Sequence, residues 1–497
     1  MRNPNPFDAL KQHEVFSEGG SSGFRVSNPD NVVTNNAVAD CQGFGYWLGF
    51  PATPWGPNHF VAMRPDRLPF GTFNDNSTHS TGAEGLMLDY VEVDNAGNVA
   101  PARYISTTDE LDPEFPFDTI QRFDVSRVVI WKSGRGGLWD YSTWPNYSGI
   151  VSADNVGRFF AGAGEDGVIE HSLAIGDSLN SATPRPEPFV EPLGGTEIPT
   201  AFATFQGAFD IRENLVVNFP LVADVRSGVF ATDDYYLHPV EMGLTRSTAN
   251  FLLDSHPGYR SRAEQEHFAL AGAVFDPEGL WGPAGQFIVY DEPFFTHGLP
   301  VSSIPPGEGT GGVSVPGPFY GIMNFVINNQ SPPDHPLMAL QATRLDPDSL
   351  APIGTWTVNE AVEEWFLSPY RHFAAHGSGL YLIEFARSPM PTDLSLGFEN
   401  MLKPEDTLVI GIQLSGAVTP EVYVEAYDRT RPYNALGSFQ ALRESSGETW
   451  WQDKPNNRVW VKLRGGFWEF WDNTGEHAVP TNDELLYEKT TLHLNTD

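Results

Sequence analysis

Residues 24–50 read FRVSNPDNVVTNNAVADCQGFGYWLGF. Asparagine recurs there at close intervals inside an apolar, β-branched and aromatic run, and no polar face of helical length accompanies it. Buried asparagine is satisfied in a stack of identical turns, where each side-chain amide bonds its neighbours in a ladder. A ladder of this kind requires a repeating sequence.

The sequence does repeat. The segment TNNAVADCQGFGYWL (34–48) aligns with NDNSTHSTGAEGLML (74–88), and both consist of a polar turn, small residues, a glycine and an apolar strand. Three pairs of residues match at this offset of 40: Asn36 with Asn76, Gly45 with Gly85, and Leu48 with Leu88. Looser copies surround Asn155 and, further on, Asn214 and Asn218.

Repeats of this length, with short strands and asparagine at the bends, predict a right-handed parallel β-helix. One coil cannot bury its inner face alone, so stacked coils bury a continuous column of Val, Ile, Leu and Phe. We expect Asn31, Asn35 and Asn36 at bends, because asparagine tolerates left-handed backbone and caps its neighbours. The alternative is that they are loop asparagines of a β-sandwich.

Composition indicates an all-β protein of at least two domains. The chain has 497 residues, of which 40% are hydrophobic, and this is too many for one ordinary core. Gly (48) and Pro (41) are abundant while only 19% of residues are charged, which favours short strands and turns over surface helices. The single cysteine, Cys41, excludes an intrachain disulfide.

The net charge of −35 bears on partners. It repels nucleic acid and anionic membrane surfaces, and it leaves cations and neutral sugars as easier partners, although it is also a common means of staying soluble. An anionic polysaccharide would need a local basic cleft. No apolar run reaches membrane-spanning length, and the first residues lack the pattern of an export signal, so we expect no membrane insertion.

The composition and the hydrophobic pattern of the sequence divide the chain into three parts. We expect the β-helix in residues 1–300, loops or a linker in residues 301–336, and an antiparallel β-sandwich in residues 337–497. The alternating segments LYLIEFA, TLVIGIQL, EVYVEAY and RVWVKLRG indicate the sandwich, and TVNEAVEEWF (357–366) predicts a short helix. The open first coil is expected to need a cap from a missing N-terminal domain of a longer protein or from a partner.

Three ordered motifs resemble one known family. They are SNPDNVVTNNAVADCQGFGYWLGFP (27–51), FNDNSTHSTGAEGLML (73–88) and WKSGRGGLWDYSTWPNYSGIVSADNVGRFFA (131–161). They resemble successive coils of the β-helix region of the cell-migration-inducing hyaluronidase family, which includes fibrocystin-like and bacterial proteins. The resemblance covers about residues 28–218.

The resemblance implies a right-handed parallel β-helix, an extracellular or cell-surface location, and a link to hyaluronan or related glycans. The family's eight-glycine domain lies N-terminal to the helix and contributes to hyaluronan depolymerisation. It has no counterpart in this sequence. The resemblance therefore supports the prediction of the fold more strongly than the prediction of the activity.

The densest polar constellation is ATDDYYLHPVEMGLTRSTANFLLDSHPGYR (231–260). Polysaccharide hydrolysis uses two carboxylates, whereas elimination from a uronate needs a base and a cation that neutralises the carboxylate. The candidate catalytic residues are Asp233, Asp234, Tyr236, His238, Arg246 and His256, with Arg260 as a candidate substrate-binding cation. The alternative is a surface turn with capping Asp and packed Tyr, since composition alone is not a site.

The C-terminal part concentrates tryptophan, which can offer sugar rings a flat apolar platform. Trp450 and Trp451 are candidate substrate-binding residues, and because they are consecutive they should face opposite ways. We interpret Trp460 and Trp468 as sandwich core. A faint calcium-loop pattern, DNAGN (94–98), lacks the distal bidentate Glu, so Ca2+ is one candidate ion and no cofactor is required.

Three functions stay open on this sequence. One is a polysaccharide depolymerase, as a glycosidase or a lyase, with a cleft near residues 233–260. The second is a non-catalytic adhesion or matrix-binding module. The third is a tailspike-like protein, which would form a stable trimer. Zinc-peptidase, nucleotide-binding and esterase motifs do not occur.

Overall fold

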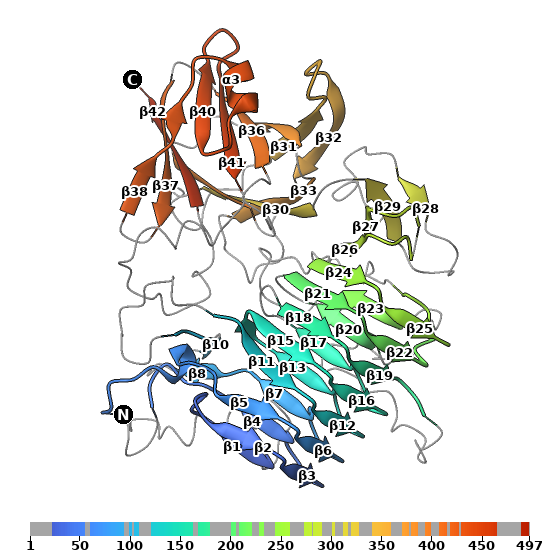
Figure 1. The fold of residues 1–497 in the computed structure, drawn as a ribbon. Helices are drawn as coiled ribbons and strands as arrows, with labels where there is room; N and C mark the ends of the chain where they lie inside the picture. Colours follow the sequence, from blue (N-terminus) through green and yellow to red (C-terminus); the bar gives the residue numbers. More distant parts are fainter. Residues whose placement is uncertain are drawn as a thin grey trace.

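The chain up to residue 258 winds into seven coils, each of which gives one strand to each of three parallel sheets (Figure 1). This computed structural model describes residues 22–54, 60–93, 99–101, 104–108, 121–162, 167–178, 200–204, 208–220, 228–232, 244–258, 273–280, 282–290, 301–303, 312–316, 320–327, 340–358, 370–376, 379–385, 393–398, 407–414, 418–426, 429–464 and 489–496. Among them the strands form a parallel β-helix, as the sequence predicts.

The three sheets are named A, B and C in the order in which each coil visits them. Sheet A contains β1 (Phe24–Val26), β4 (Tyr46–Leu48), β7 (Leu86–Leu88), β13 (Leu138–Asp140), β17 (Phe160–Gly162), β20 (Thr200–Thr204) and β23 (Gly228–Thr232). Sheet B begins with β2 (Val32–Thr34), β5 (Thr72–Asn74), β11 (Phe123–Ser126), β15 (Pro145–Ser148), β18 (Gly167–Glu170), β21 (Ala208–Arg212), β24 (Leu244–Thr248) and β26 (Ala273–Asp276). Sheet C contains β3 (Ala37–Ala39), β6 (Ser77–His79), β12 (Val129–Trp131), β16 (Val151–Ala153), β19 (Leu173–Ile175), β22 (Leu215–Val217) and β25 (Phe251–Leu253).

The predicted repeat is the structural repeat. Thr34 pairs with Asn74 across β2 and β5, and Leu48 pairs with Leu88 across β4 and β7, so the offset of 40 is the register of the first two coils. At Gly45 an added Cβ would meet the side chain of Thr78 and the carbonyl of Gly85. Only glycine allows this approach between coils.

Each coil turns from sheet B to sheet C through one residue in the left-handed region. The φ angles there lie between 50° and 63°, at Asn35, Asp75, Arg127, Gly149, His171, Glu213 and Ala249. The next residue points inward in every coil: Asn36, Asn76, Val128, Ile150, Ser172, Asn214 and Asn250. The prediction for Asn35 and Asn36 is confirmed, while Asn31 lies in the A-to-B connection and donates its side-chain amide to the Asn28 carbonyl (2.6 Å).

A second bend, from sheet C back to sheet A, uses the same conformation. Its left-handed residues are Asp40, Ser80, Lys132, Asp154, Asn218 and Asp254. Inside the coils, apolar side chains of all three sheets form one continuous core, including Tyr46, Phe73, Ile169, Phe202 and Phe230. The fifth coil has Gly176 at this bend, without the left-handed conformation. Bends of recurring geometry keep each strand in register with the next, so outward side chains form columns.

Short elements surround the coils. They are η2 (Pro65–Arg67), β8 (Val91–Val93) paired with β9 (Val99–Pro101), and β10 (Tyr104–Ile105) paired with β14 (Ser142–Thr143). After β26, sheet B continues with antiparallel strands β27 (Gln286–Tyr290), β29 (Gly312–Pro316) and β28 (Ser302–Ser303).

The C-terminal part consists of two mainly antiparallel sheets, at the top of Figure 1. The six-stranded sheet contains β33 (Tyr370–His376), β30 (Tyr320–Ile327), β35 (Asp393–Phe398), β42 (Lys489–Thr496), β37 (Val418–Ala426) and β38 (Arg429–Pro432). The seven-stranded sheet contains β32 (Pro352–Val358), β31 (Leu340–Leu345), β34 (Leu380–Phe385), β36 (Thr407–Gln413), β41 (Arg458–Arg464), β40 (Thr449–Asp453) and β39 (Asn434–Ala435). The pairs β34/β36 and β39/β40 are parallel.

The four alternating segments predicted as strands are β34, β36, β37 and β41. Trp460 is 2% exposed and belongs to the core, as predicted, whereas Trp468 lies outside the described residues. Most of the helix predicted over residues 357–366 also lies outside the described residues. Its first two residues, Thr357 and Val358, are the last two residues of strand β32. A short helix, α3 (Phe439–Glu444), precedes β40.

The range 301–336, where the sequence predicts loops, contains β28, β29 and β30. The first two extend sheet B, and β30 pairs with β33 and β35. Proline and glycine punctuate this range and obscure the extended segments, whose partners lie far away in the sequence. The two boundaries between the three predicted parts remain predictions.

Candidate functional site

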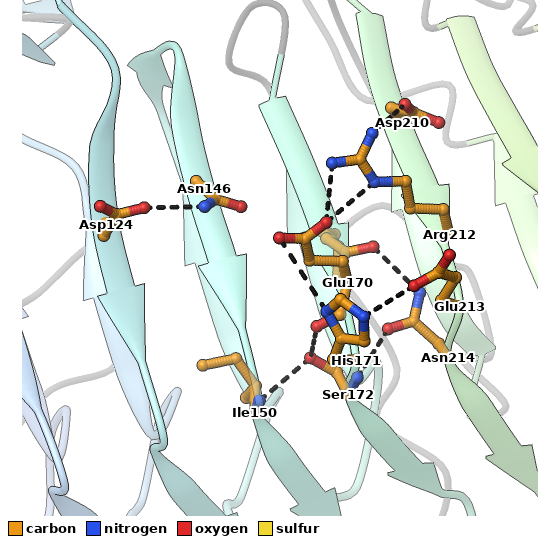
Figure 2. A network of polar contacts seen from close by, with 11 residues as sticks. Asp124, Asn146, Ile150, Glu170, His171, Ser172, Asp210, Arg212, Glu213 and Asn214 are labelled. Carbon is orange, nitrogen blue, oxygen red and sulfur yellow. Dashed lines mark hydrogen bonds and ion pairs between the residues drawn. The ribbon is translucent and has the colours of Figure 1, made fainter.

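The outer face of sheet B carries a row of polar side chains on successive coils (Figure 2). Side chains alternate along a strand, so the outward positions of β11, β15, β18, β21 and β24 stack at about 4.8 Å intervals. In register, Asp124 lies beside Asn146, and Asp210 lies beside Arg246. We call this face, with the adjoining bend residues His171 and Glu213, the sheet-B flank.

Arg212 occupies the centre of the flank and holds two carboxylates. Its Nε and Nη2 donate to Oε2 of Glu170 at 2.9 and 2.7 Å, and its Nη1 donates to Oδ2 of Asp210 at 3.4 Å (Figure 2). The hydrogen bond to Glu170 raises the pKa of Arg212 further above its ordinary value, so the guanidinium is always charged. Both strong bonds use Oε2 of Glu170, and its other oxygen, Oε1, lies on the side of His171.

His171 lies between two carboxylates at the bend of the fifth coil. Its Nε2 is 2.7 Å from Oε2 of Glu213, and its Nδ1 is 4.0 Å from Oε1 of Glu170. The side chains of His171 and Glu213 are 62% and 55% exposed, whereas that of Glu170 is 17% exposed. An imidazole and two carboxylates thus meet at the surface, where a ligand can reach them.

A ladder of inward polar groups fixes the bends that carry these residues. Oδ1 of Asn214 accepts the backbone N–H of Ser172 at 2.9 Å, and the amide of Asn214 donates to Ile169 O and to Oδ1 of Asn250, both at 3.0 Å. The hydroxyl of Ser172 accepts from the N–H of Ile150 at 3.0 Å. The ladder leaves the outward side chains of the neighbouring residues little freedom to move apart.

A second polar contact extends the flank toward the third coil. The amide of Asn146 donates to Oδ1 of Asp124 at 2.7 Å (Figure 2). On the flank, carboxylates outnumber guanidinium groups: the carboxylates belong to Asp124, Glu170, Asp210 and Glu213, and the guanidinium groups to Arg212 and Arg246. Such a surface accepts hydrogen bonds from the hydroxyls of neutral sugars and offers Arg212 and Arg246 as the cations for an anionic group.

No metal site accompanies the flank. Within the part of the chain that the structure describes, no three His, Cys, Asp or Glu side chains are grouped so that they could hold a metal ion. The faint calcium pattern of residues 94–98 lies outside the described residues.

Two of the predicted catalytic residues can be placed. Arg246 is half-buried on the outer face of β24, whereas His256 lies at the bend from sheet C to sheet A of the same coil. Nδ1 of His256 accepts the N–H of Gly258 at 3.0 Å, and its backbone bonds Phe219 and Val229. The structure therefore puts Arg246 and His256 on different faces and does not bring them together.

The remaining predicted catalytic residues fall outside the described residues. Asp233, Asp234, Tyr236 and His238 lie in the segment that joins β23 to β24, and Arg260 follows the seventh coil. They stay predictions.

The two candidate tryptophans face opposite sides of β40. Trp451 packs against Phe439, with ring centroids 5.9 Å apart, and joins the core around Trp460. Trp450 is half-buried on the other face. Of the two, Trp450 is the one whose ring leaves the core, as expected for consecutive strand residues.

Sequence reasoning missed the residues at the centre of the flank. Glu170, His171, Arg212 and Glu213 do not form a motif, because their contacts run between coils 42 residues apart. One signal could have found them. Once Asn214 is taken as the inward ladder residue, the strings IEHS (169–172) and IREN (211–214) align, and their second and third letters must point outward.

Comparison with known proteins agrees with the architecture. Residues 3–86 match the family model of the CEMIP beta-helix. The N-terminal part of the chain is thus similar to the CEMIP beta-helix. The cell surface hyaluronidase CEMIP2 of Homo sapiens is 26% identical over 179 residues, which are 32% of this chain and 13% of that protein.

Two further relatives match part of the chain. The cell migration-inducing and hyaluronan-binding protein of Homo sapiens is 27% identical over 181 residues, 33% of this chain and 13% of that protein. Fibrocystin-L of Homo sapiens is 37% identical over 65 residues, 13% of this chain and 2% of that protein. The chain thus matches only a small share of the length of each of these relatives, 2% to 13%. No helix among the described residues has the length and apolarity needed to cross a lipid bilayer.

Proposed function

We propose that this chain is an extracellular glycan-binding β-helix protein and that the sheet-B flank receives the polysaccharide. The observation that carries the proposal is the row of half-buried and exposed polar side chains in register over five coils, on a β-helix similar to proteins named for hyaluronan. A repeating surface suits a repeating polymer, because the same kind of contact recurs at each step along it.

The chemistry of the flank sets the class of ligand. Arg212 and His171 can donate to sugar oxygens, and the carboxylate oxygens of Glu170, Asp210 and Glu213 can accept from sugar hydroxyls. The excess of carboxylates favours hydroxyl-rich segments over closely spaced anions. A hyaluronan-like polymer, with one uronate per disaccharide, would place its carboxylate at a guanidinium and its hydroxyls at the acids.

The catalytic form of the proposal uses the two carboxylates on either side of Arg212. Hydrolysis of a glycosidic bond needs one carboxylic acid and one carboxylate, and Glu170 and Asp210 supply that pair. The predicted patch at residues 233–260 is the other candidate for this role. The alternative function is a non-catalytic adhesion or matrix-binding module, which needs only binding.

Binding and cleavage can be tested on the same samples. The full chain is titrated with high-mass hyaluronan and with its carboxyl-esterified, neutral form. We expect the double variant His171→Asn/Arg212→Gln to bind about tenfold more weakly, because it loses hydrogen bonds to charged groups. Asparagine keeps the left-handed bend at His171, where φ is 50°.

Arg127→Gln is the matched control, since Arg127 occupies the same bend two coils earlier and is paired only with Asp75 and its own neighbour among the described contacts. It should bind as the wild type does. Failure to bind either polymer would contradict the proposed function. Size-exclusion chromatography of hyaluronan, with absorbance for unsaturated uronate, then separates the catalytic from the non-catalytic form of the proposal. Fragments that appear with the wild type but not with Glu170→Gln indicate a depolymerase at the flank. An intact polymer indicates an adhesion module.

A further inference from the structure

The outer face of sheet C is apolar over its last five strands. Outward side chains form two columns across β12, β16, β19, β22 and β25. The first column is Val129, Val151, Leu173, Leu215 and Phe251, and the second is Trp131, Ala153, Ile175, Val217 and Leu253. We call these ten residues the apolar strip.

The strip is open to solvent at both ends. Phe251 and Leu253 are 64% and 46% exposed, and Val129 and Leu215 are 39% exposed. Contiguous exposed apolar surface of this kind marks an interaction site. The strip is mainly aliphatic, with its two aromatic residues at opposite ends, so it lacks the aromatic platform that stacks sugar rings. The negative chain also disfavours an anionic membrane.

We propose that the apolar strip binds the same strip of a second copy of this chain, with the two β-helices antiparallel. A two-fold axis crossing the strip at β19 would place Leu173 and Ile175 against their own copies. The proposal does not depend on glycan binding, because the ten residues of the strip lie on sheet C and none of them belongs to the sheet-B flank. The two surfaces adjoin at the B-to-C bends, where His171 and Glu213 belong to the flank.

The side chains are complementary in this register. In this arrangement β12 faces β25 of the second copy, and β16 faces β22 of the second copy. Phe251, the largest side chain of its column, meets Val129, and Leu253 meets Trp131. Leu215 meets Val151, and Val217 meets the small Ala153. Large residues therefore oppose smaller ones along both columns, as packed apolar interfaces require.

The charges that border the strip are also complementary. Along the edge formed by the C-to-A bends, Lys132 would face Asp254 of the second copy, and Asp154 would face Asn218. The position on the axis is Gly176, which brings no charge against its own copy. Lys132 and Asp254 have φ of 55° and 49°, so both side chains leave the coil in the same way.

The other edge, formed by the B-to-C bends, fits the same arrangement. Arg127 would face Ala249, whose backbone N–H binds Glu278 at 2.9 Å, so a carboxylate stands close to the guanidinium. A parallel pair, with the two-fold axis along the helix, would place Ala249 and its bound Glu278 against Asp254 at equal height, and would place Arg127, which is paired with Asp75 of its own chain, against Lys132. Like charges in contact disfavour that arrangement.

The size of the strip sets the expected strength. Five strands span about 19 Å, so the strip with its edges falls below the roughly 800 Å² per partner of a standard interface. Two chains of charge −35 also repel each other. We therefore expect a dimer in the micromolar range that strengthens as salt screens the repulsion.

Sedimentation velocity of the full chain at about 0.15 M NaCl, from about 1 to about 100 µM, tests the proposal. The weight-average mass should rise toward that of two chains. Leu173→Lys puts two like charges on the axis and should weaken association at least about tenfold. A wild-type chain that stays monomeric over this range, or a dimer that Leu173→Lys leaves unchanged, would overturn the proposal.

A charge exchange tests the antiparallel register. Lys132→Asp alone and Asp254→Lys alone should each weaken association, and the double variant should restore it, because each variant residue then meets its opposite charge. All variants lie on the surface, and an unchanged thermal unfolding midpoint shows that each one folds. Weakening by both single variants without recovery in the double variant would overturn the antiparallel pairing and the proposal with it.

Discussion

One residue at each bend between sheets B and C adopts left-handed backbone whatever its side chain. Asn35 and Gly149 are suited to it, but Arg127, Glu213 and Ala249 do the same. A side chain with a Cβ pays about 1–2 kcal/mol for this conformation. The cost is met by the hydrogen bonds of the following inward residue and by strand pairing on both sides.

His256 is the residue whose charge state the fold constrains most clearly. Burial lowers the pKa of His256 below its ordinary value of 6.5, and its Nδ1 accepts a hydrogen bond from Gly258 that a protonated ring could not accept. Below pH 6.5 the unfolded chain binds the proton more readily than the folded chain. The contribution of neutral His256 to the free energy of unfolding is therefore fully present above pH 6.5, and it is lost as pH decreases through 6.5 toward the folded-state pKa.

When pH is lowered from neutral to mildly acidic, we expect the thermal unfolding midpoint of the wild type to fall by more than that of His256→Asn. Asparagine keeps an acceptor for the Gly258 N–H but does not titrate. All other titrating groups are common to both proteins, so the difference isolates His256. Equal losses in the two proteins would contradict the assignment.

At the scale of the element, the inward column at the B-to-C bend is not uniform. It reads Asn, Asn, Val, Ile, Ser, Asn and Asn along the coils, and polar neighbours bond each other while the apolar pair packs. The amide of Asn36 donates to Oδ1 of Asn76 at 3.2 Å. A polar ladder is thus built in two short runs, one at each end of the helix.

Asn214→Ala should reduce the free energy of unfolding by about 2 kcal/mol, because it leaves the buried N–H of Ser172 and the carbonyl of Ile169 without their partner. Asn36→Ala is the control of the same residue type in the same column. The side chain of Asn36 is half-buried in the first coil and only donates hydrogen bonds, so its loss should reduce the free energy of unfolding less than half as much. Urea unfolding measures both, and equal costs would show that the ladder does not act through buried partners.

At the scale of the whole molecule, net charge opposes compactness. The excess of 35 negative charges repels itself in the folded chain more than in the expanded one. Local pairs such as Arg212 with Glu170 act in the opposite direction, but they are few and partly exposed.

Raising NaCl from low to about 0.5 M should therefore raise the thermal midpoint by about 3 °C, which corresponds to about 1 kcal/mol for a domain of this size. Tetramethylammonium chloride at equal ionic strength should give the same rise, because screening does not depend on the cation. A midpoint that falls with salt would mean that local ion pairs outweigh the general repulsion.

The sequence by itself determined the coil. Asn36 and Asn76, with Gly45 and Gly85, set the register, because bends and close approaches between coils accept few residue types. The core followed from the apolar strands. The alternating segments likewise gave the C-terminal strands, since period-two alternation is a local property.

Only the tertiary structure decided the surfaces. Glu170 and Arg212 are 42 residues apart, and the apolar strip gathers strands from residue 129 to residue 253. Which outward residues become neighbours depends on the length of every connection between coils, and those lengths vary along the chain. Consecutive strands of a coil belong to different sheets, so the two described candidate residues of the constellation at residues 231–260, Arg246 and His256, lie on different faces of one coil.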